Sequence, residues 1–243
     1  MSKIVSGYAF RIIKRILPKI SATEKAALNS GSVSIDGDIF SGYLDINKLV
    51  KKYDAKLKDH ENAFLNKETN ELCEMIDNDK IEKNQDLSID VWDYIKNNKF
   101  MGLVIPKKYE GLEFSPHAHS LIVEKIASRN ITCAVSVMVP NSLGPGELLH
   151  QYGTDEQKKY FLPKLASGTY VPCFGLTTEN SGSDAASMLD RGIVVVENGI
   201  LGMRVTFSKR YITLAPVASV IGLAFKLLDP NKLLTTGKEG ITV

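Results

Sequence analysis

The sequence predicts an α+β protein in which a helical-bundle domain is followed by a β-domain of barrel or sandwich type. Up to about residue 168, apolar residues recur with the spacing of amphipathic helices. After that point, short β-branched runs alternate with turn dipeptides: 193–196, Asn198-Gly199, 203–207, 217–221 and Asp229-Pro230. With 243 residues, of which 44% are hydrophobic and 24% charged, the chain can build two modest cores.

Residues 1–43 are predicted to form a basic amphipathic head and a linker. Five positive charges precede the first acid, Glu24, and an apolar residue recurs at every fourth position between Ile4 and Ile20. A helix of this kind either lies on an anionic membrane surface or packs its apolar face on the protein. A capping box at Ser21–Glu24 begins a short helix, and the Gly-, Ser- and Asp-rich residues 30–43 read as a loop.

Residues 44–168 are predicted to form the helical domain. Helices are expected at 59–79, from Ser88, from Ser115 to Arg129, at 131–140, at 147–151 and from Thr154. Pro163 and Gly168 are expected to end the last of these helices. His117 and His119 lie two positions apart on one helix and face different ways, so we expect solvent-facing imidazoles rather than a metal pair.

Composition excludes several classes of function. A net charge of +2 without a basic, aromatic-rich stripe argues against a nucleic-acid partner. Cys73, Cys133 and Cys173 lie far apart without CxxC spacing, so no metal site and no disulfide framework is predicted. The chain contains neither an 18-residue apolar run nor a signal-peptide pattern. We therefore expect a cytoplasmic location, with membrane-peripheral contact through residues 1–20 as an extension of it.

A cluster of hydroxyls follows the apolar run Cys173–Leu176, which reads as a buried strand. The hydroxyls belong to Thr177, Thr178, Ser181 and Ser183, with Gly182 between the two serines. Successive backbone N–H groups in a tight turn of this kind can form a concavity that accepts a phosphate. Physical reasoning alone leaves two interpretations open, an ordinary polar turn and an anion-binding rim.

Four ordered motifs resemble those of the acyl-CoA dehydrogenase family. They are GLVIPKKYEGLEFS (102–115), YGTDEQKKYFLPKLASG (152–168), TTENSGSD (177–184) and SKRYIT (208–213). The segments NSLGPGELL, KRYITLAP and GLAFKLLDP resemble most closely the large bacterial branch that acts in fatty-acid β-oxidation. The sequence departs from the pattern at Glu110, where the family has glycine, and at Glu179, where it has proline.

The resemblance implies FAD as cofactor and long-chain acyl-CoA as substrate, oxidised to trans-2-enoyl-CoA. Removing a proton from Cα and a hydride from Cβ requires a flavin and a carboxylate base. By motif position, Leu176 and Thr177 would meet the polar edge of the flavin, and Ser183 its pyrophosphate. Tyr211 and Thr213 would lie beside the flavin ring.

Phe174 would wall the same site. The resemblance also implies electron-transfer flavoprotein as a redox partner.

No residue of this chain is assigned as the catalytic base. In the family the β-domain continues beyond the position of Val243, and a C-terminal helical bundle supplies the glutamate, much of the acyl-CoA pocket and the oligomer interface. We therefore expect residues 169–243 to be a partial β-domain and the polypeptide to be an N-terminal fragment with little activity alone.

Unpaired strand edges in such a β-domain predict self-association. The alternative function is a non-catalytic interaction or membrane-surface module with the same fold. A flavin-dependent acyl-CoA oxidase or a nitroalkane-type relative would share the same N-terminal motifs.

Overall fold

The computed structural model describes residues 7, 10, 11, 13, 14, 35–52, 56–142, 144–235 and 239–243. Contacts divide the chain into two compact units, residues 1–55 and 56–243. The capping box at Ser21–Glu24 and most of the basic segment 1–20 lie outside the described residues. The domain boundaries that the sequence predicts at residues 43 and 168 stay predictions.

In the first unit, residues 35–52 form two short helices, α3 (Ile35–Ser41) and α4 (Ile46–Lys52). The loop expected at 30–43 is therefore wrong over α3. Asp36 and Asp38 lie in the first turn of α3, where acidic side chains favour a helix start. Gly42 follows with φ of +76°, a left-handed conformation that ends the helix.

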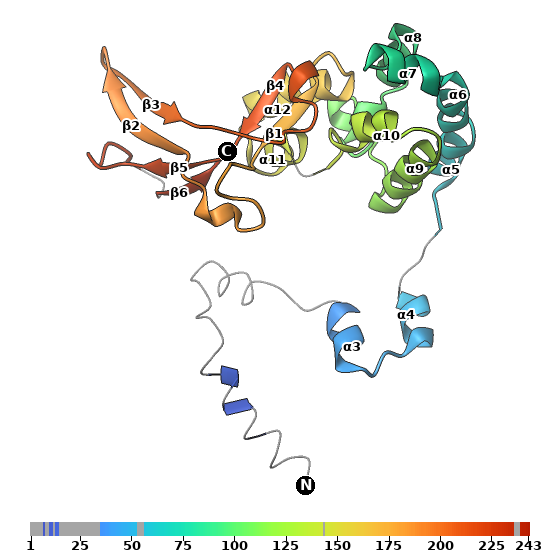
Figure 1. The fold of residues 1–243 in the computed structure, drawn as a ribbon, viewed down its shortest axis with the longest axis horizontal. Helices are drawn as coiled ribbons and strands as arrows, with labels where there is room; N and C mark the ends of the chain where they lie inside the picture. The colour runs from blue at the N-terminus through green and yellow to red at the C-terminus, as the bar shows by residue number, and fades with distance from the viewer. Residues whose placement is uncertain are drawn as a thin grey trace. The chain divides into compact units, whose positions relative to one another are not determined.

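The second unit begins with helices and short 3₁₀ turns (Figure 1). In chain order they are α5 (Asp59–Asn66), α6 (Glu68–Met75), α7 (Asn78–Asn84), α8 (Ile89–Asn97), η1 (Phe100–Gly102), η2 (Lys107–Tyr109), α9 (Pro116–Arg129), α10 (Ile131–Met138), α11 (Pro145–Tyr152) and α12 (Asp155–Ala166). The helix expected at 59–79 is thus divided at Lys67 and ends at Met75.

Two buried clusters hold the helices together. The larger one joins α5, α6, α8, α9 and α10 around fully buried side chains such as Leu72, Ile95 and Ile122. The smaller one packs Leu162 and Leu165 of α12 against Ile105. Apolar residues at helical spacing therefore face the core, as the sequence predicts.

Two details of the helical region differ from expectation. Pro163 lies inside α12 and does not end it, since Leu165 and Ala166 are both buried in the core; the helix ends at Ala166, just before Gly168 with its left-handed φ of +70°. His119 is not solvent-facing, since its Nε2 is buried and has no hydrogen-bond partner among the described residues. Burial lowers the pKa of His119.

The strands and turns after residue 170 form two small sheets. They are β1 (Pro172–Gly175), η3 (Ala185–Ser187), β2 (Arg191–Glu197), β3 (Ile200–Thr206), η4 (Ala215–Val217), β4 (Val220–Leu223), β5 (Phe225–Leu228) and β6 (Gly240–Thr242). β1 pairs with β4 in parallel, and the second sheet has the order β3-β2-β5-β6, in which β2 and β5 are parallel. The α+β prediction is confirmed.

The strand expected at 217–221 begins only at Val220. Leu214 adopts a left-handed conformation with φ of +65°, and Pro216 follows in a 3₁₀ turn. Val171 then fixes the start of β4, because its carbonyl accepts the amides of Ser219 and Val220 at 2.9 and 3.2 Å. A non-local contact therefore sets this boundary.

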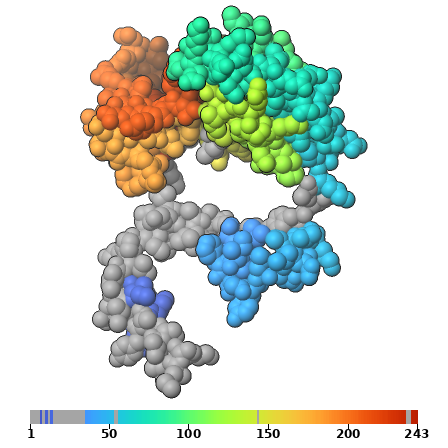
Figure 2. Space-filling view, turned by 45° about the vertical axis from the view of Figure 1, so that its right-hand side comes forward, coloured from blue at the N-terminus to red at the C-terminus, as the bar shows by residue number. Residues whose placement is uncertain are grey.

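The strand region packs directly against the helices. In the space-filling view the orange and red β-strands lie against the helical part of the same unit (Figure 2). The contacts run from α11 to β1 and β4. Among the described residues, the helices lack the length and apolar character needed to cross a bilayer.

Candidate functional site

The hydroxyl cluster forms a tight bend directly after β1. The amide of Thr178 donates to the carbonyl of Ser181 at 3.0 Å, and the hydroxyl of Ser181 donates to the carbonyl of Asp184 at 2.7 Å. Thr178 and Ser181 are buried, whereas Gly182 and Ser183 are exposed. A Cβ atom on Gly182 would meet nothing within 4 Å. The bend therefore presents its tip to open space.

The second motif lies against this bend. Thr178 forms an antiparallel bridge with Lys209, and the amide of Arg210 donates to the carbonyl of Thr177 at 3.1 Å. The ammonium of Lys209 donates to the carbonyl of Leu176 at 3.0 Å. Motifs 177–184 and 208–213 are therefore neighbours in the fold.

Lys209 also makes a buried ion pair with Asp190. Its Nζ lies 2.7 Å from Oδ2 of Asp190, and the side chains are only 7% and 4% exposed, respectively. Oδ1 of Asp190 accepts the amide of Ser208 at 2.8 Å. Burial alone would raise the pKa of Asp190, but the Lys209 ammonium and the Ser208 amide hold it below its usual range.

The predicted cofactor residues fall into two groups. Phe174, Leu176 and Thr177 are half-buried at the end of β1. Ser183, Tyr211 and Thr213 are exposed, with Tyr211 86% exposed and its backbone left-handed at φ of +57°. The bend and the Lys209–Arg210 segment are joined by hydrogen bonds, but contact of any of the six residues with a flavin stays a prediction.

The bend contains one buried hydroxyl without a partner. Oγ1 of Thr178 is buried and has no hydrogen-bond partner among the described residues. A buried polar atom is normally paired, so an unpaired one has hydrogen-bonding capacity for a ligand. Ser183 and the tip at Gly182 are exposed and accessible to a polar ligand group, whereas Oγ1 of Thr178 is covered by protein atoms and becomes accessible only if the bend opens.

The sequence places Thr178 in the hydroxyl cluster of the bend but does not indicate Asp190 or Lys209 as residues of the site. Lys209 lies inside the SKRYIT motif, which was a usable signal. Nothing in the sequence indicated Asp190 as its partner, since the two residues meet only in the folded chain.

Each carboxylate near the bend is engaged. Glu179 pairs with Arg210 at 3.1 Å on the surface. Asp184 accepts the hydroxyl of Ser187, and Asp190 is paired with Lys209. All three carboxylates therefore have a polar partner. The described part of the chain contains no group of three or more His, Cys, Asp or Glu side chains that could hold a metal ion.

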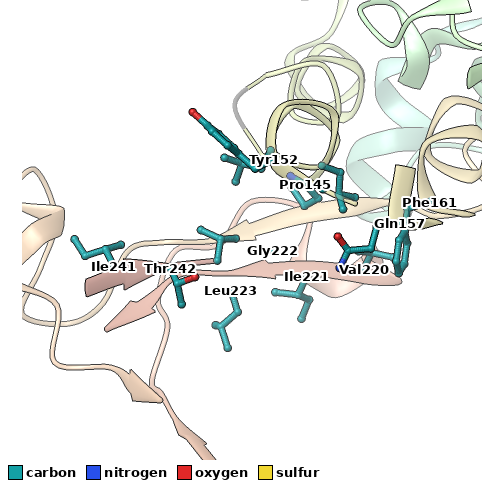
Figure 3. Close-up of a pocket in the computed structure, with 14 residues that line it drawn as sticks. Pro145, Tyr152, Gln157, Phe161, Val220, Ile221, Gly222, Leu223, Ile241 and Thr242 are labelled. Atoms are coloured by element: carbon teal, nitrogen blue, oxygen red, sulfur yellow. The ribbon is translucent and has the colours of Figure 1, made fainter. Parts of the chain in front are cut away.

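A separate cavity of about 520 Å³ lies between α11, α12, β4 and β6 (Figure 3). Its lining is largely apolar and includes Pro145, Leu149, Phe161, Ile221 and Ile241. Figure 3 shows β4 passing beneath Pro145, with the ring of Phe161 at one end. The sequence analysis did not predict this cavity.

Comparison with known proteins identifies the helical region. Residues 54–169 match the family "Acyl-CoA dehydrogenase, N-terminal domain". An acyl-CoA dehydrogenase of Bacillus subtilis is 28% identical over 162 residues, which cover 67% of this chain and 40% of the relative. A 3-(aryl)acrylate reductase of Clostridium sporogenes is 32% identical over 165 residues, covering 68% and 41%.

Solved structures share the fold. Butyryl-CoA dehydrogenase of Megasphaera elsdenii superposes with a TM-score of 0.62 at 23% identity, covering 72% of this chain and 46% of that one. The chain therefore spans less than half the length of these relatives. Residues 54–169 belong to the acyl-CoA dehydrogenase N-terminal domain family.

Proposed function

We propose that the protein is the FAD-holding N-terminal part of an acyl-CoA dehydrogenase. It would act on long-chain acyl-CoA in fatty-acid β-oxidation and pass electrons to electron-transfer flavoprotein. The observation that carries the proposal is the joining of the TTENSGSD and SKRYIT motifs by the Thr177–Arg210 and Leu176–Lys209 bonds. When bound, the flavin would supply hydride acceptance.

The chain's own residues would hold and orient the cofactor. The hydroxyls of Thr177 and Ser183 would donate to its polar edge and its phosphates, with that of Thr178 joining them if the bend opens, while Phe174 and Tyr211 would provide apolar walls. The three acids beside the bend already have polar partners, and none of them is assigned as the base for proton abstraction. We therefore expect little dehydrogenation by this chain alone.

Flavin binding and turnover test the two parts of the proposal separately. Titration of purified protein with FAD, followed by quenching of flavin fluorescence, should show saturable binding. Palmitoyl-CoA and an artificial electron acceptor should then give no turnover above that of free FAD. Absence of FAD binding would contradict the cofactor assignment. Clear turnover would contradict the proposal that this chain has little dehydrogenase activity alone.

The alternative function has its own signature. Binding to anionic vesicles that is lost at high salt, without any FAD binding, would favour a membrane-surface module.

The exposed ion pair between Arg204 and Glu197 offers a neutral control for the FAD titration, since Arg204→Ala should leave FAD binding unchanged.

A further inference from the structure

Lys209 links three segments that are distant in sequence. Its ammonium donates to the carbonyl of Leu176 at 3.0 Å and to Oδ2 of Asp190 at 2.7 Å. Asp190 in turn accepts the amide of Ser208 through its other oxygen, and its own carbonyl accepts the amide of Lys226 at 2.9 Å. The pair therefore connects the bend after β1, the start of β2, the Ser208–Lys209 segment and β5.

The burial of this pair separates it from the other ion pairs near the site. The Lys209 and Asp190 side chains are 7% and 4% exposed, whereas Arg210 and Glu179 are 48% and 60% exposed. Exposed pairs contribute little to stability, but removing one partner of a buried pair leaves an uncompensated charge. The structure thus depends on both members of the buried pair being present.

Lys209 is badly placed to bind a ligand directly. Two of its three N–H donors already have protein acceptors, and little of its side chain reaches the surface. The Leu176 carbonyl that it holds, however, belongs to the bend whose next residues are the candidate cofactor contacts Thr177 and Thr178.

We propose that Asp190 and Lys209 form a positioning clamp, which holds the 176–178 bend against residues 208–210 and thereby sets the affinity for the cofactor. The effect on the cofactor rests on the proposed function, whereas the clamping itself does not. Neither residue needs to touch the cofactor, because the clamp fixes the backbone from which Thr177 and Thr178 project.

Amide hydrogen exchange measures the clamp without any cofactor. In Lys209→Met, the amides of Thr178, Ser208 and Arg210 should exchange at least about tenfold faster than in wild type, because they open with the bend. The amides of α9 should change much less. Exchange within about twofold of wild type at these three amides, or equal acceleration in α9, would overturn the proposal.

Two further variants keep the experiment decisive. Arg204→Met removes an exposed pair in the same region and should leave the bend amides unchanged. Glu61→Gln weakens a contact between the starts of α5 and α9, which are not part of the bend, and controls for general loss of stability. If Lys209→Met does not fold, the isosteric Asp190→Asn replaces it, with the same result expected.

FAD titration of the same variants tests the link to the cofactor. Lys209→Met should bind FAD at least about tenfold more weakly than wild type, while Glu61→Gln should match wild type. Equal FAD affinity in wild type and Lys209→Met would overturn the positioning role. If wild type itself binds no FAD, the proposed function fails, and hydrogen exchange alone decides whether the clamp exists.

Discussion

The carboxylate of Glu61 accepts the backbone amide of Ser115 at 2.6 Å, although the two residues are 54 positions apart. Its other oxygen accepts the amide of Lys58 at 2.9 Å, and Glu61 is fully buried. Burial would raise the pKa of Glu61, but the two amides hold it below its usual range. One acid therefore ties the start of α5 to the start of α9.

Glu61→Gln should lower the free energy of unfolding by about 1–3 kcal/mol. Glutamine has one acceptor oxygen, so one of the two amides would face an NH₂ group instead. Urea denaturation followed by far-UV circular dichroism measures the loss. The exposed Glu124→Gln on α9 is the matched control and should stay within about 0.5 kcal/mol of wild type. Equal effects of the two variants would contradict the role given to Glu61.

Thr178→Val should separate stability from ligand binding. Its buried hydroxyl has no partner among the described residues, so an isosteric methyl should leave stability unchanged or raise it. FAD affinity should nevertheless fall, since the proposed donor is lost. Thermal unfolding and FAD titration of the same sample measure both effects.

Ser181→Ala is the comparison for that variant, since it removes the hydrogen bond to Asp184 and should cost about 1 kcal/mol. A marked loss of stability in Thr178→Val would mean that its hydroxyl serves the protein and not a ligand.

Stability should decline as the pH falls below about 6.5, the ordinary pKa of histidine. Because burial lowers the pKa of His119 in the folded state, the unfolded chain takes up the proton first and is favoured on acidification. His119→Leu should flatten the dependence between pH 7.5 and 5.5 in urea denaturation, a range chosen to span that ordinary value. Parallel pH profiles for variant and wild type would show that His119 is not responsible.

Glu110→Gly should stabilise the protein by about 0.5–1 kcal/mol. Glu110 adopts φ of +66°. This left-handed conformation is energetically less favourable for a residue with a Cβ atom than for glycine. Its backbone bonds to Lys107 and Lys99 do not need the side chain. Differential scanning calorimetry measures the gain, and Glu82→Gly inside α7 should instead cost about 1 kcal/mol. If Glu110→Gly is less stable than wild type, the Glu110 carboxylate makes a contact that stabilises the protein by more than glycine gains in the left-handed conformation.

Self-association should depend on strand β3, which is one edge of the four-stranded sheet (Figure 1). Leu201 and Met203 are 52% and 53% exposed on one face of this strand, so its free edge and its apolar face are both available to a second copy. Met203→Lys should reduce the apparent mass in light scattering at high concentration. Thr206→Lys, on the opposite face, is the control, and a monomeric wild type would contradict the prediction.

Sequence alone determined that helices precede strands in the chain and located both motifs of the candidate site, because periodicity and short motifs are local properties of the chain. The Asn198-Gly199 turn between β2 and β3 was readable for the same reason: both residues have positive φ, as that dipeptide predicts. Helix α3 departs from the sequence prediction because the glycine and aspartates at 36–38 are residues that favour loops.

Only the tertiary structure decided which distant residues meet. The Asp190–Lys209 pair, the Glu61–Ser115 bond and the burial of Thr178 all depend on contacts between segments far apart in the sequence. The start of β4 and the continuation of α12 through Pro163 were likewise set by such contacts, through Val171 and the buried Leu165. The physical reason is that packing energy and the pairing of buried polar groups depend on the whole fold, whereas propensity acts within a few residues.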